Sequence, residues 1–326
     1  MLKKIIHLFQ RLPGCVQDFS GNHREFGPKV AGHQFRSALL PGVKPKSYIE
    51  SLSARTIQEL APVTARYVRG EYTVHAPKMK LRKTPVWVCW WQGEEHMPPL
   101  VKACVAQMRR CLPDWAEVQV ITWDNLESYI DFPPYILEKF RKGLITNIHL
   151  TDILRYGLMS RYGGAWIDST VFLSDRIQEK LPQYLSAPYF TQCFESWDAC
   201  PGEACRGKWC NFFFMGTAGN PLFSYVYESL LLWWQNHNRL IDYVIVDYVI
   251  WAGYCGVPAI RSCIDAVAPG NEHIWSMAKG LNDPYEPEAF EALMQSNDFF
   301  KLSYKGRLDP ATPDGKKTVY THILER

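Results

Sequence analysis

Four side chains near the middle of the chain could together bind a polar, anionic ligand. Asp152 and Arg155 are three positions apart, so they would be neighbours on one face of a helix. Asp168 follows a short apolar segment, and Thr170 comes two positions later. A guanidinium group can hold phosphate oxygens with two parallel hydrogen bonds, and carboxylate and hydroxyl oxygens suit hard metal ions.

The segments between these residues predict how they are positioned. Apolar residues recur at helical spacing and predict a stripe that packs inward; they are Leu150, Ile153, Leu154 and Leu158. Gly163 and Gly164 end that helix and let the backbone approach another segment closely. Residues 165–167 form a short apolar strand that carries Asp168 at its end, and ligands bind at such strand ends in α/β sheets.

The pair Asp152 and Arg155 has a simpler interpretation as an ion pair on a helix surface, which is the usual fate of this spacing. Such a pair would add at most about 1 kcal/mol to stability. Its position immediately before Gly163, Gly164 and Asp168 favours a functional role instead.

The segment as a whole resembles the donor-site signature of glycosyltransferase family 32 and its relatives. That signature reads D-x-x-R, then Y-G-G, then D-x-D, and the matching residues are Asp152 and Arg155, Tyr162 to Gly164, and Asp168 to Thr170. The similarity is closest to the branch of capsular polysaccharide synthesis proteins. It runs from about residue 85 to the C-terminus and is strongest over residues 86–170. One position departs from the signature, because Thr170 stands where the second acid belongs.

The resemblance implies an α/β fold of the GT-A type, which is a single Rossmann-like nucleotide-sugar transferase domain with a mostly parallel central sheet. We expect this domain over residues 81–326 and a helical N-terminal extension over residues 1–80. The clearest helical stretch of the extension runs from Tyr48 to Tyr67.

The resemblance also implies roles at the donor site. Asp168 would be catalytic, and Asp152 and Arg155 would hold hydroxyl groups of the donor sugar. A divalent ion, Mn2+ or Mg2+, would neutralise the leaving diphosphate. Because Thr170 offers only a neutral hydroxyl, we expect a weakened metal site; its ligands would be Asp168, Thr170 and His322. Further cations that could neutralise the diphosphate are Lys301, Lys305 and Arg307, the two lysines as part of the nucleotide site.

Residues 85–93 form a continuous apolar run, which is typical of a strand buried in a parallel sheet. A helix over residues 98–112 and a strand over residues 117–122 follow, as in the nucleotide-binding half of the GT-A fold. The positions that match the family's base-binding segment are Trp90, Trp91 and Gln92. An aromatic face would stack on uracil and the amide would read its edge. Alternate strand residues face opposite sides, so two of the three could instead belong to the core.

Two polar residues interrupt later apolar segments. Asn211 lies in a strand that faces the active site in the family, and it must bond either a sugar hydroxyl, which we favour, or the neighbouring backbone. Asp247 falls inside an apolar helix expected over residues 242–254, so it is ion-paired or points into the cleft. The resemblance implies retention of anomeric configuration. Asp247 is the one candidate nucleophile, and front-face transfer without a protein nucleophile is equally open. The C-terminal residues 299–322 alternate like strands around a Pro-Asp-Gly turn.

Composition excludes several classes of protein. With 47% hydrophobic and 21% charged residues the chain is globular, and a net charge of +3 gives no case for nucleic-acid binding. The N-terminal segment is too short and interrupted for a signal peptide, and residues 243–260 lack the uninterrupted length of a membrane span. We therefore expect a cytoplasmic protein with reduced thiols. Four cysteines lie close together without zinc-knuckle spacing; they are Cys193, Cys200, Cys205 and Cys210.

The first twelve residues mix apolar side chains with Lys3, Lys4 and Arg11. An amphipathic segment of this kind could contact anionic lipid at the inner face of the cell membrane. A helix docked on the body with a solvated basic face is an equal alternative.

The leading interpretation is a retaining glycosyltransferase that moves a hexose from a nucleotide-diphosphate sugar to a glycan or lipid-linked acceptor. UDP is the expected nucleotide, and bacterial capsular polysaccharide synthesis is the expected process. The alternative is a non-catalytic sugar-nucleotide or glycan-binding relative, which the replacement of the second acid by Thr170 supports. A third interpretation, a zinc-dependent interaction module built on the cysteines, lacks ligands with the usual spacing.

Overall fold

A mixed five-stranded sheet forms the centre of the computed structural model, which describes residues 18–39, 44–196 and 203–326. The strand order is β2-β1-β3-β6-β5, with bounds Ala116–Ile121, Thr84–Cys89, Gly164–Ile167, Phe213–Gly216 and Tyr189–Thr191. Strands β2, β1 and β3 are parallel, β6 is antiparallel to β3, and β5 is antiparallel to β6. Four of the five strands therefore point the same way, which confirms an α/β fold with a mostly parallel central sheet.

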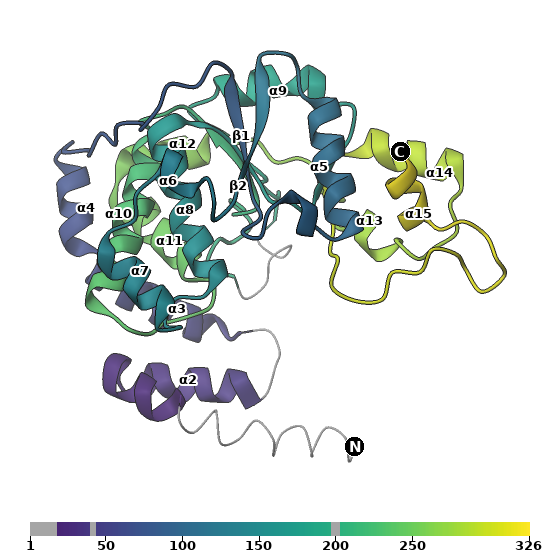
Figure 1. Cartoon of the computed structure of the whole chain (residues 1–326). Helices are drawn as coiled ribbons and strands as arrows, with labels where there is room; N and C mark the ends of the chain where they lie inside the picture. The colour runs from purple at the N-terminus through teal and green to yellow at the C-terminus, as the bar shows by residue number, and fades with distance from the viewer. Residues whose placement is uncertain (1–17, 40–43, 197–202) are drawn as a thin grey trace.

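The two faces of the sheet are covered by different helices, because successive strand residues point to opposite sides. Trp87 and Trp166 belong to the hydrophobic cluster that contains α8 (Asn147–Tyr162), α10 (Pro221–Asn236) and α11 (Ile245–Gly256). Val86 and Ile167 belong to the cluster that contains α5 (Pro99–Cys111) and α9 (Ile177–Ser186). Figure 1 shows these two groups of helices on either side of β1 and β2.

The N-terminal helices α2 (Pro28–Leu39), α3 (Lys46–Glu59) and α4 (Ala61–Val68) extend the cluster of α10 and α11. The expected single helix from Tyr48 to Tyr67 is divided at Leu60, which lies between α3 and α4 and is fully buried. In Figure 1 these helices form the purple group below and to the left of the sheet. The basic segment proposed to contact lipid, residues 1–12, lies outside the described residues.

The C-terminal part forms a smaller layer beside α5. Strand β7 (Phe299–Lys301) pairs antiparallel with β4 (Val171–Leu173), and helices α13 (Ser276–Lys279), α14 (Pro287–Ser296) and α15 (Val319–Glu325) pack around them. The expected strands over residues 299–322 form only in part: β7 is present, and around the Pro-Asp-Gly turn the pairing is limited to one isolated antiparallel bridge, between Ala311 and Lys317. Thr318 makes a second isolated bridge, with Pro284, and the chain ends in α15 because Thr318 caps a helix by accepting from Thr321 N.

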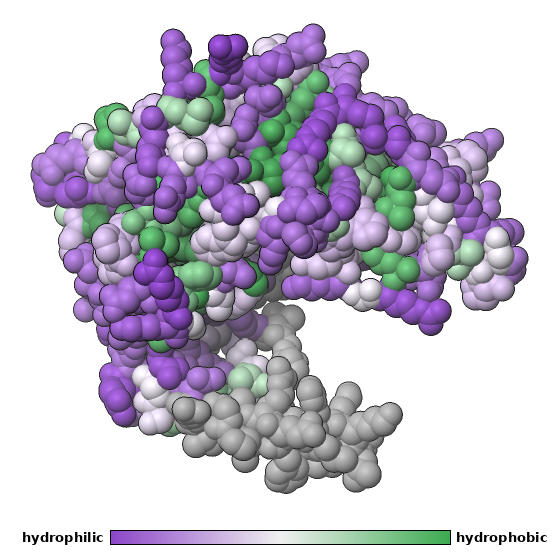
Figure 2. Space-filling view, viewed as in Figure 1, coloured by the Kyte–Doolittle hydropathy of each residue, from purple (hydrophilic) through white to green (hydrophobic). Residues whose placement is uncertain are grey.

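Four further helices are short. They are α6 (Leu126–Tyr129), α7 (Pro134–Arg141), α12 (Pro258–Asp265) and the 3-10 helix η1 (Glu94–His96). Figure 2 shows a face on which hydrophilic side chains predominate and apolar ones form small separate groups. Within the described ranges, no helix combines the length and the apolar character needed to cross a membrane.

Candidate active site

A cavity of about 930 Å3 opens at the C-terminal ends of β1 and β3. Because these two strands are parallel neighbours, the residues that follow each of them meet at one edge of the sheet. Eight residues predicted from the sequence line this cavity: Trp90, Trp91, Gln92, Arg155, Asp168, Thr170, Lys301 and Lys305. Asp152, Asn211, Asp247 and His322 are not among its lining residues.

The Gly163-Gly164 turn fixes the start of β3 and thereby the position of Asp168. Both glycines have positive φ, 63° and 89°, which residues with a Cβ rarely adopt. A Cβ on Gly164 would lie 2.2 Å from the carbonyl oxygen of Pro85, and one on Gly163 would lie 2.4 Å from Ala218 N. The double glycine is therefore required for β3 to approach β1 and the segment after β6.

Asp152 and Arg155 form a buried ion pair, which rules out the surface-pair interpretation. Their side chains are 8% and 9% exposed, and Arg155 Nη2 lies 3.4 Å from Asp152 Oδ1 and 3.8 Å from Asp168 Oδ1. Arg155 Nη1 donates to the backbone carbonyl of Asn211, and the guanidinium lies over the Trp166 ring, 5.1 Å from its centroid. Burial raises the pKa of the Asp152 carboxyl, although Arg155 opposes that shift. Asp152 therefore acts on the cavity through Arg155.

Lys301 joins the two residues that match the ends of the D-x-D signature. Its Nζ lies 2.7 Å from Asp168 Oδ2 and 2.8 Å from Thr170 Oγ1. The other carboxylate oxygen, Asp168 Oδ1, accepts a hydrogen bond of 3.0 Å from Trp166 Nε1. Burial alone would raise the pKa of Asp168, but Lys301 and Arg155 outweigh it and hold that pKa below its ordinary value. Asp168 is therefore an anion held between two cations.

These residues do not fit a divalent-cation site of the D-x-D kind. Mn2+ and Mg2+ take oxygen ligands, with carboxylates and waters prominent among them. Here one carboxylate and one neutral hydroxyl are present, and both already accept hydrogen bonds from Lys301. Across the part of the chain that the structure describes, no three His, Cys, Asp or Glu side chains gather in a way that could hold a metal ion.

The aromatic residues after β1 differ in their surroundings. Trp91 is packed like a core residue, since its ring stacks on Trp123 at 4.2 Å and its Nε1 donates to Thr151 Oγ1 at 3.0 Å. The Trp90 and Tyr304 rings form a T-shaped pair with 5.7 Å between their centroids. Within the described ranges, the buried Nε1 of Trp90 has no hydrogen-bond partner. Trp90 thus combines a buried indole N–H that lacks a partner with a place in the cavity lining. Tyr304 also lines the cavity and was not predicted as a site residue from the sequence, although it lies between Lys301 and Lys305.

Asn211 and Asp247 form a hydrogen-bonded pair behind Arg155. Asn211 Oδ1 accepts from the Tyr156 hydroxyl at 2.6 Å, and its Nδ2 donates to Asp247 Oδ1 at 2.6 Å. Trp209 Nε1 donates to the same oxygen of Asp247 at 2.9 Å. Burial raises the pKa of Asp247 to about 7, although these two hydrogen bonds lower it. The amide of Asn211 thus bonds neighbouring side chains, and Asp247 does not line the cavity.

His322, which was expected as a metal ligand, does not line the cavity that contains Asp168 and Thr170. Its ring stacks on Tyr285 at 3.7 Å and meets the edge of Phe290 at 4.7 Å, within the C-terminal layer. His322 lies in α15, where a strand was expected, and its packing against these two aromatic rings determines its position. The cysteine segment includes Cys200, which lies outside the described residues; Cys193 and Cys210 are free thiols.

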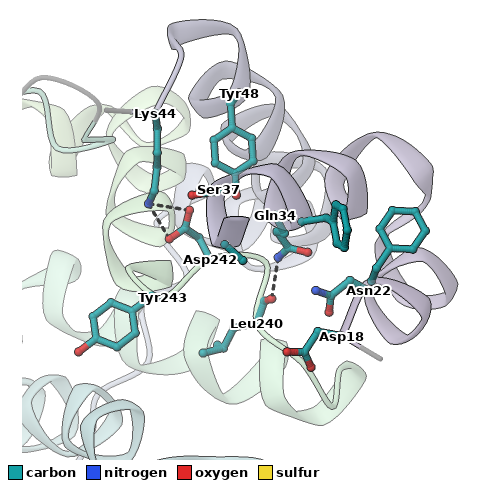
Figure 3. Close-up of a pocket in the computed structure, with 12 residues that line it drawn as sticks. Asp18, Asn22, Gln34, Ser37, Lys44, Tyr48, Leu240, Asp242 and Tyr243 are labelled. Atoms are coloured by element: carbon teal, nitrogen blue, oxygen red, sulfur yellow. Dashed lines mark hydrogen bonds and ion pairs between the residues drawn. The ribbon is translucent and has the colours of Figure 1, made fainter. Parts of the chain in front are cut away.

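A second cavity, of about 460 Å3, lies beside the first and shares Tyr243 with it. It is bounded by the N-terminal helices and the segment before α11. Figure 3 shows Lys44 bonded to Asp242, with 2.8 Å between Nζ and each carboxylate oxygen, and Gln34 donating to the carbonyl of Leu240. Tyr243 itself is 61% exposed. Amide, carboxylate and aromatic groups therefore line this second cavity, and Tyr243 lines both.

Comparison with known proteins identifies the family. A model of the capsular polysaccharide synthesis protein family matches residues 45–323, which is most of the chain. This chain belongs to that family. The match begins at the start of α3, so it includes two of the helices assigned from the sequence to an N-terminal extension.

Two fungal relatives resemble parts of the chain. The O-glycosyltransferase braB of Annulohypoxylon truncatum is 31% identical over 102 residues, which cover 29% of this chain and 24% of that protein. The O-glycosyltransferase PaGT of Phomopsis amygdali is 26% identical over 192 residues, which cover 55% of this chain and 46% of that protein. The chain spans less than half the length of either relative.

Proposed function

We propose that this chain is a retaining glycosyltransferase that moves a hexose from a nucleotide-diphosphate sugar to a glycan or lipid-linked acceptor. The observation that carries the proposal is the set of Arg155, Asp168 and Lys301 in one cavity at the C-terminal ends of β1 and β3. Two cations facing a cavity suit a diphosphate, and a carboxylate between them suits sugar hydroxyls. Family membership and the two relatives named as O-glycosyltransferases support the same reaction class.

The donor would lie with its base against the aromatic residues after β1. Trp90 and Tyr304 offer two aromatic rings and Gln92 an amide in the cavity lining, and Lys305 lines the same cavity. UDP is the nucleotide we propose, because the single ring of uracil would stack on the Trp90 indole and form hydrogen bonds with the Gln92 amide. The D-x-x-R, Y-G-G and Asp168 positions support a place among the GT-A relatives of family 32.

In the proposed reaction the bond between the anomeric carbon and the β-phosphate oxygen breaks, and its electron pair leaves with the nucleoside diphosphate. A hydroxyl oxygen of the acceptor forms the new bond to the anomeric carbon and passes its proton to the departing phosphate oxygen. Lys301 and Arg155 would stabilise the charge that develops on the diphosphate. Front-face transfer of this kind needs no protein nucleophile, which agrees with the position of Asp247 outside the cavity lining.

The acceptor would approach over Tyr243, the residue shared by the two cavities. An exposed aromatic ring beside amide and carboxylate groups suits a sugar or glycan. Contact of the basic N-terminal residues with an anionic membrane would bring the chain to the surface that holds a lipid-linked acceptor, and we propose it as a second part of the function.

Donor hydrolysis by the purified chain tests the proposal. UDP- and GDP-hexoses are incubated with wild-type protein and with Asp168→Asn, and release of nucleoside diphosphate is measured. We expect release by the wild type and at least about a hundredfold less by the variant, because one electrostatic contact of this kind is worth about that factor.

A matched control is Asp131→Asn, which removes an exposed carboxylate that also lies 2.7 Å from a lysine, Lys78. That variant should match the wild type. Tight binding of a sugar nucleotide without any turnover would favour the non-catalytic binding relative instead.

A further inference from the structure

We propose that Lys301 takes the place of the divalent cation at this donor site, so that nucleotide binding and transfer need no divalent metal ion. The proposal rests on the function proposed above. In this arrangement the neutral side chain of Thr170 helps to bind a cation, and that cation is the ammonium group of Lys301.

The geometry around Lys301 is the first support. Its ammonium lies between Asp168 Oδ2 and Thr170 Oγ1, at 2.7 and 2.8 Å, where the two ends of a D-x-D signature would converge on an ion. An ammonium group has three N–H donors. Two are used by Asp168 and Thr170 among the described residues, which leaves one for a phosphate oxygen in the cavity that Lys301 lines.

The charge balance is the second support. Asp152 and Asp168 carry two negative charges, and Arg155 and Lys301 carry two positive charges, within one connected set of ion pairs. A divalent ion at the same place would have to displace Lys301 and would find one carboxylate and one hydroxyl as ligands. A threonine in place of the second acid fits this arrangement, because the single positive charge of Lys301 needs only one carboxylate, Asp168, to balance it.

The backbone holds Lys301 in this position. The antiparallel pairing of β4 and β7 places Lys301 opposite Val171, directly after Thr170. Leu302 N donates to the Thr170 carbonyl at 2.9 Å, and Lys301 N donates to the Ile274 carbonyl at 2.8 Å. Lysine side chains normally lose much conformational entropy when they bind. Here the strand pairing and two acceptors fix the ammonium before any ligand arrives, so little of that loss remains.

Calorimetric titration with UDP and GDP tests the proposal without requiring turnover. Wild-type protein is titrated in EDTA and in Mn2+, and the Lys301→Met variant is titrated in both. We expect wild-type affinity to be the same in EDTA and Mn2+, and the variant to bind about ten- to a hundredfold more weakly, since a hydrogen bond to a charged group is lost. Affinity for uridine, which has no phosphate, should not change.

The matched control is Lys78→Met, which removes a lysine at 2.7 Å from the exposed Asp131. It should bind UDP like the wild type. A second variant, Thr170→Asp combined with Lys301→Met, restores two carboxylates and vacates the place of the ammonium. We expect this double variant to bind UDP more tightly in Mn2+ than in EDTA, by at least about tenfold, because its oxygen ligands now suit a hard divalent ion.

The outcomes separate this proposal from the function it rests on. Wild-type binding that requires Mn2+ overturns the role of Lys301 and leaves the transferase proposal standing. Unchanged UDP binding by Lys301→Met also overturns it. Absence of UDP and GDP binding under both conditions overturns both proposals.

Discussion

Replacement of Asp247 by Asn distinguishes two possible roles of this residue, a buried structural acid and a catalytic nucleophile. Asp247 is 7% exposed and accepts hydrogen bonds from Trp209 and Asn211 through one oxygen. An Asn at this position keeps an oxygen that can accept both bonds, and it cannot ionise. The fold should therefore persist, and only the consequences of the negative charge should disappear.

The magnitude follows from the raised pKa. Burial raises the pKa of Asp247 from 3.8 to about 7, so the folded chain holds this proton more tightly than the unfolded chain does. The contribution of Asp247 to stability is therefore full below pH 4 and is lost as the pH rises toward 7. At about 1.36 kcal/mol per pH unit, ionisation of this carboxyl lowers the free energy of unfolding by about 4 kcal/mol above pH 7. The charges nearby act in the same direction, because Glu203 and Asp152 both raise this pKa.

Urea unfolding followed by tryptophan fluorescence measures this effect. The difference in unfolding free energy between Asp247→Asn and wild type should grow in favour of the variant by about 4 kcal/mol from pH 4 to pH 8. Taking the difference removes the contributions of other carboxyl groups, such as Asp168, whose pKa is lowered. A difference that stays flat over this range would refute the reasoning. Turnover at neutral pH should remain within about tenfold of wild type, whereas loss of a nucleophile reduces it by roughly a thousandfold or more.

Two further predictions concern the donor and acceptor sides. Arg155→Lys keeps the charge but loses the planar guanidinium, so affinity for a sugar nucleotide should fall at least about tenfold in calorimetry. Asp152→Asn should have a smaller effect, because Asp152 reaches the cavity through Arg155; equal losses would contradict this order. Tyr243→Ala should raise the KM for a glycan acceptor severalfold while donor hydrolysis stays near wild type, and an unchanged KM would remove Tyr243 from the acceptor path.

Local patterns in the sequence were sufficient to predict the sheet edge that carries the proposed donor site. The helical spacing before Gly163 and the double glycine predicted α8, the turn and β3, because periodicity and positive φ are properties of short segments. The apolar run of residues 85–93 predicted β1, although the strand ends at Cys89. Parallel strands meet at a common edge, so Trp90 to Gln92 and Asp168 were expected together, and the structure brings them together.

Other features depended on contacts between distant segments, which no local pattern encodes. The burial of Asp152 and Arg155 follows from their packing beneath Asn211 and Trp166, whereas their spacing alone also fits an exposed pair. Asp247 is directed toward Asn211 by the packing of α11, and His322 is held by the rings of Tyr285 and Phe290.

The residue whose position depended most on tertiary structure is Lys301. The sequence by itself placed Asp168 and Thr170 at a strand end and showed that an acid was missing from the signature. Which cation faces them was decided by the register of β4 with β7, two strands far apart in the sequence. A shift of one residue in that pairing would turn the Lys301 side chain to the opposite face of the two-stranded sheet. The sequence therefore determined the anionic half of the site, and the long-range strand pairing decided its cationic half.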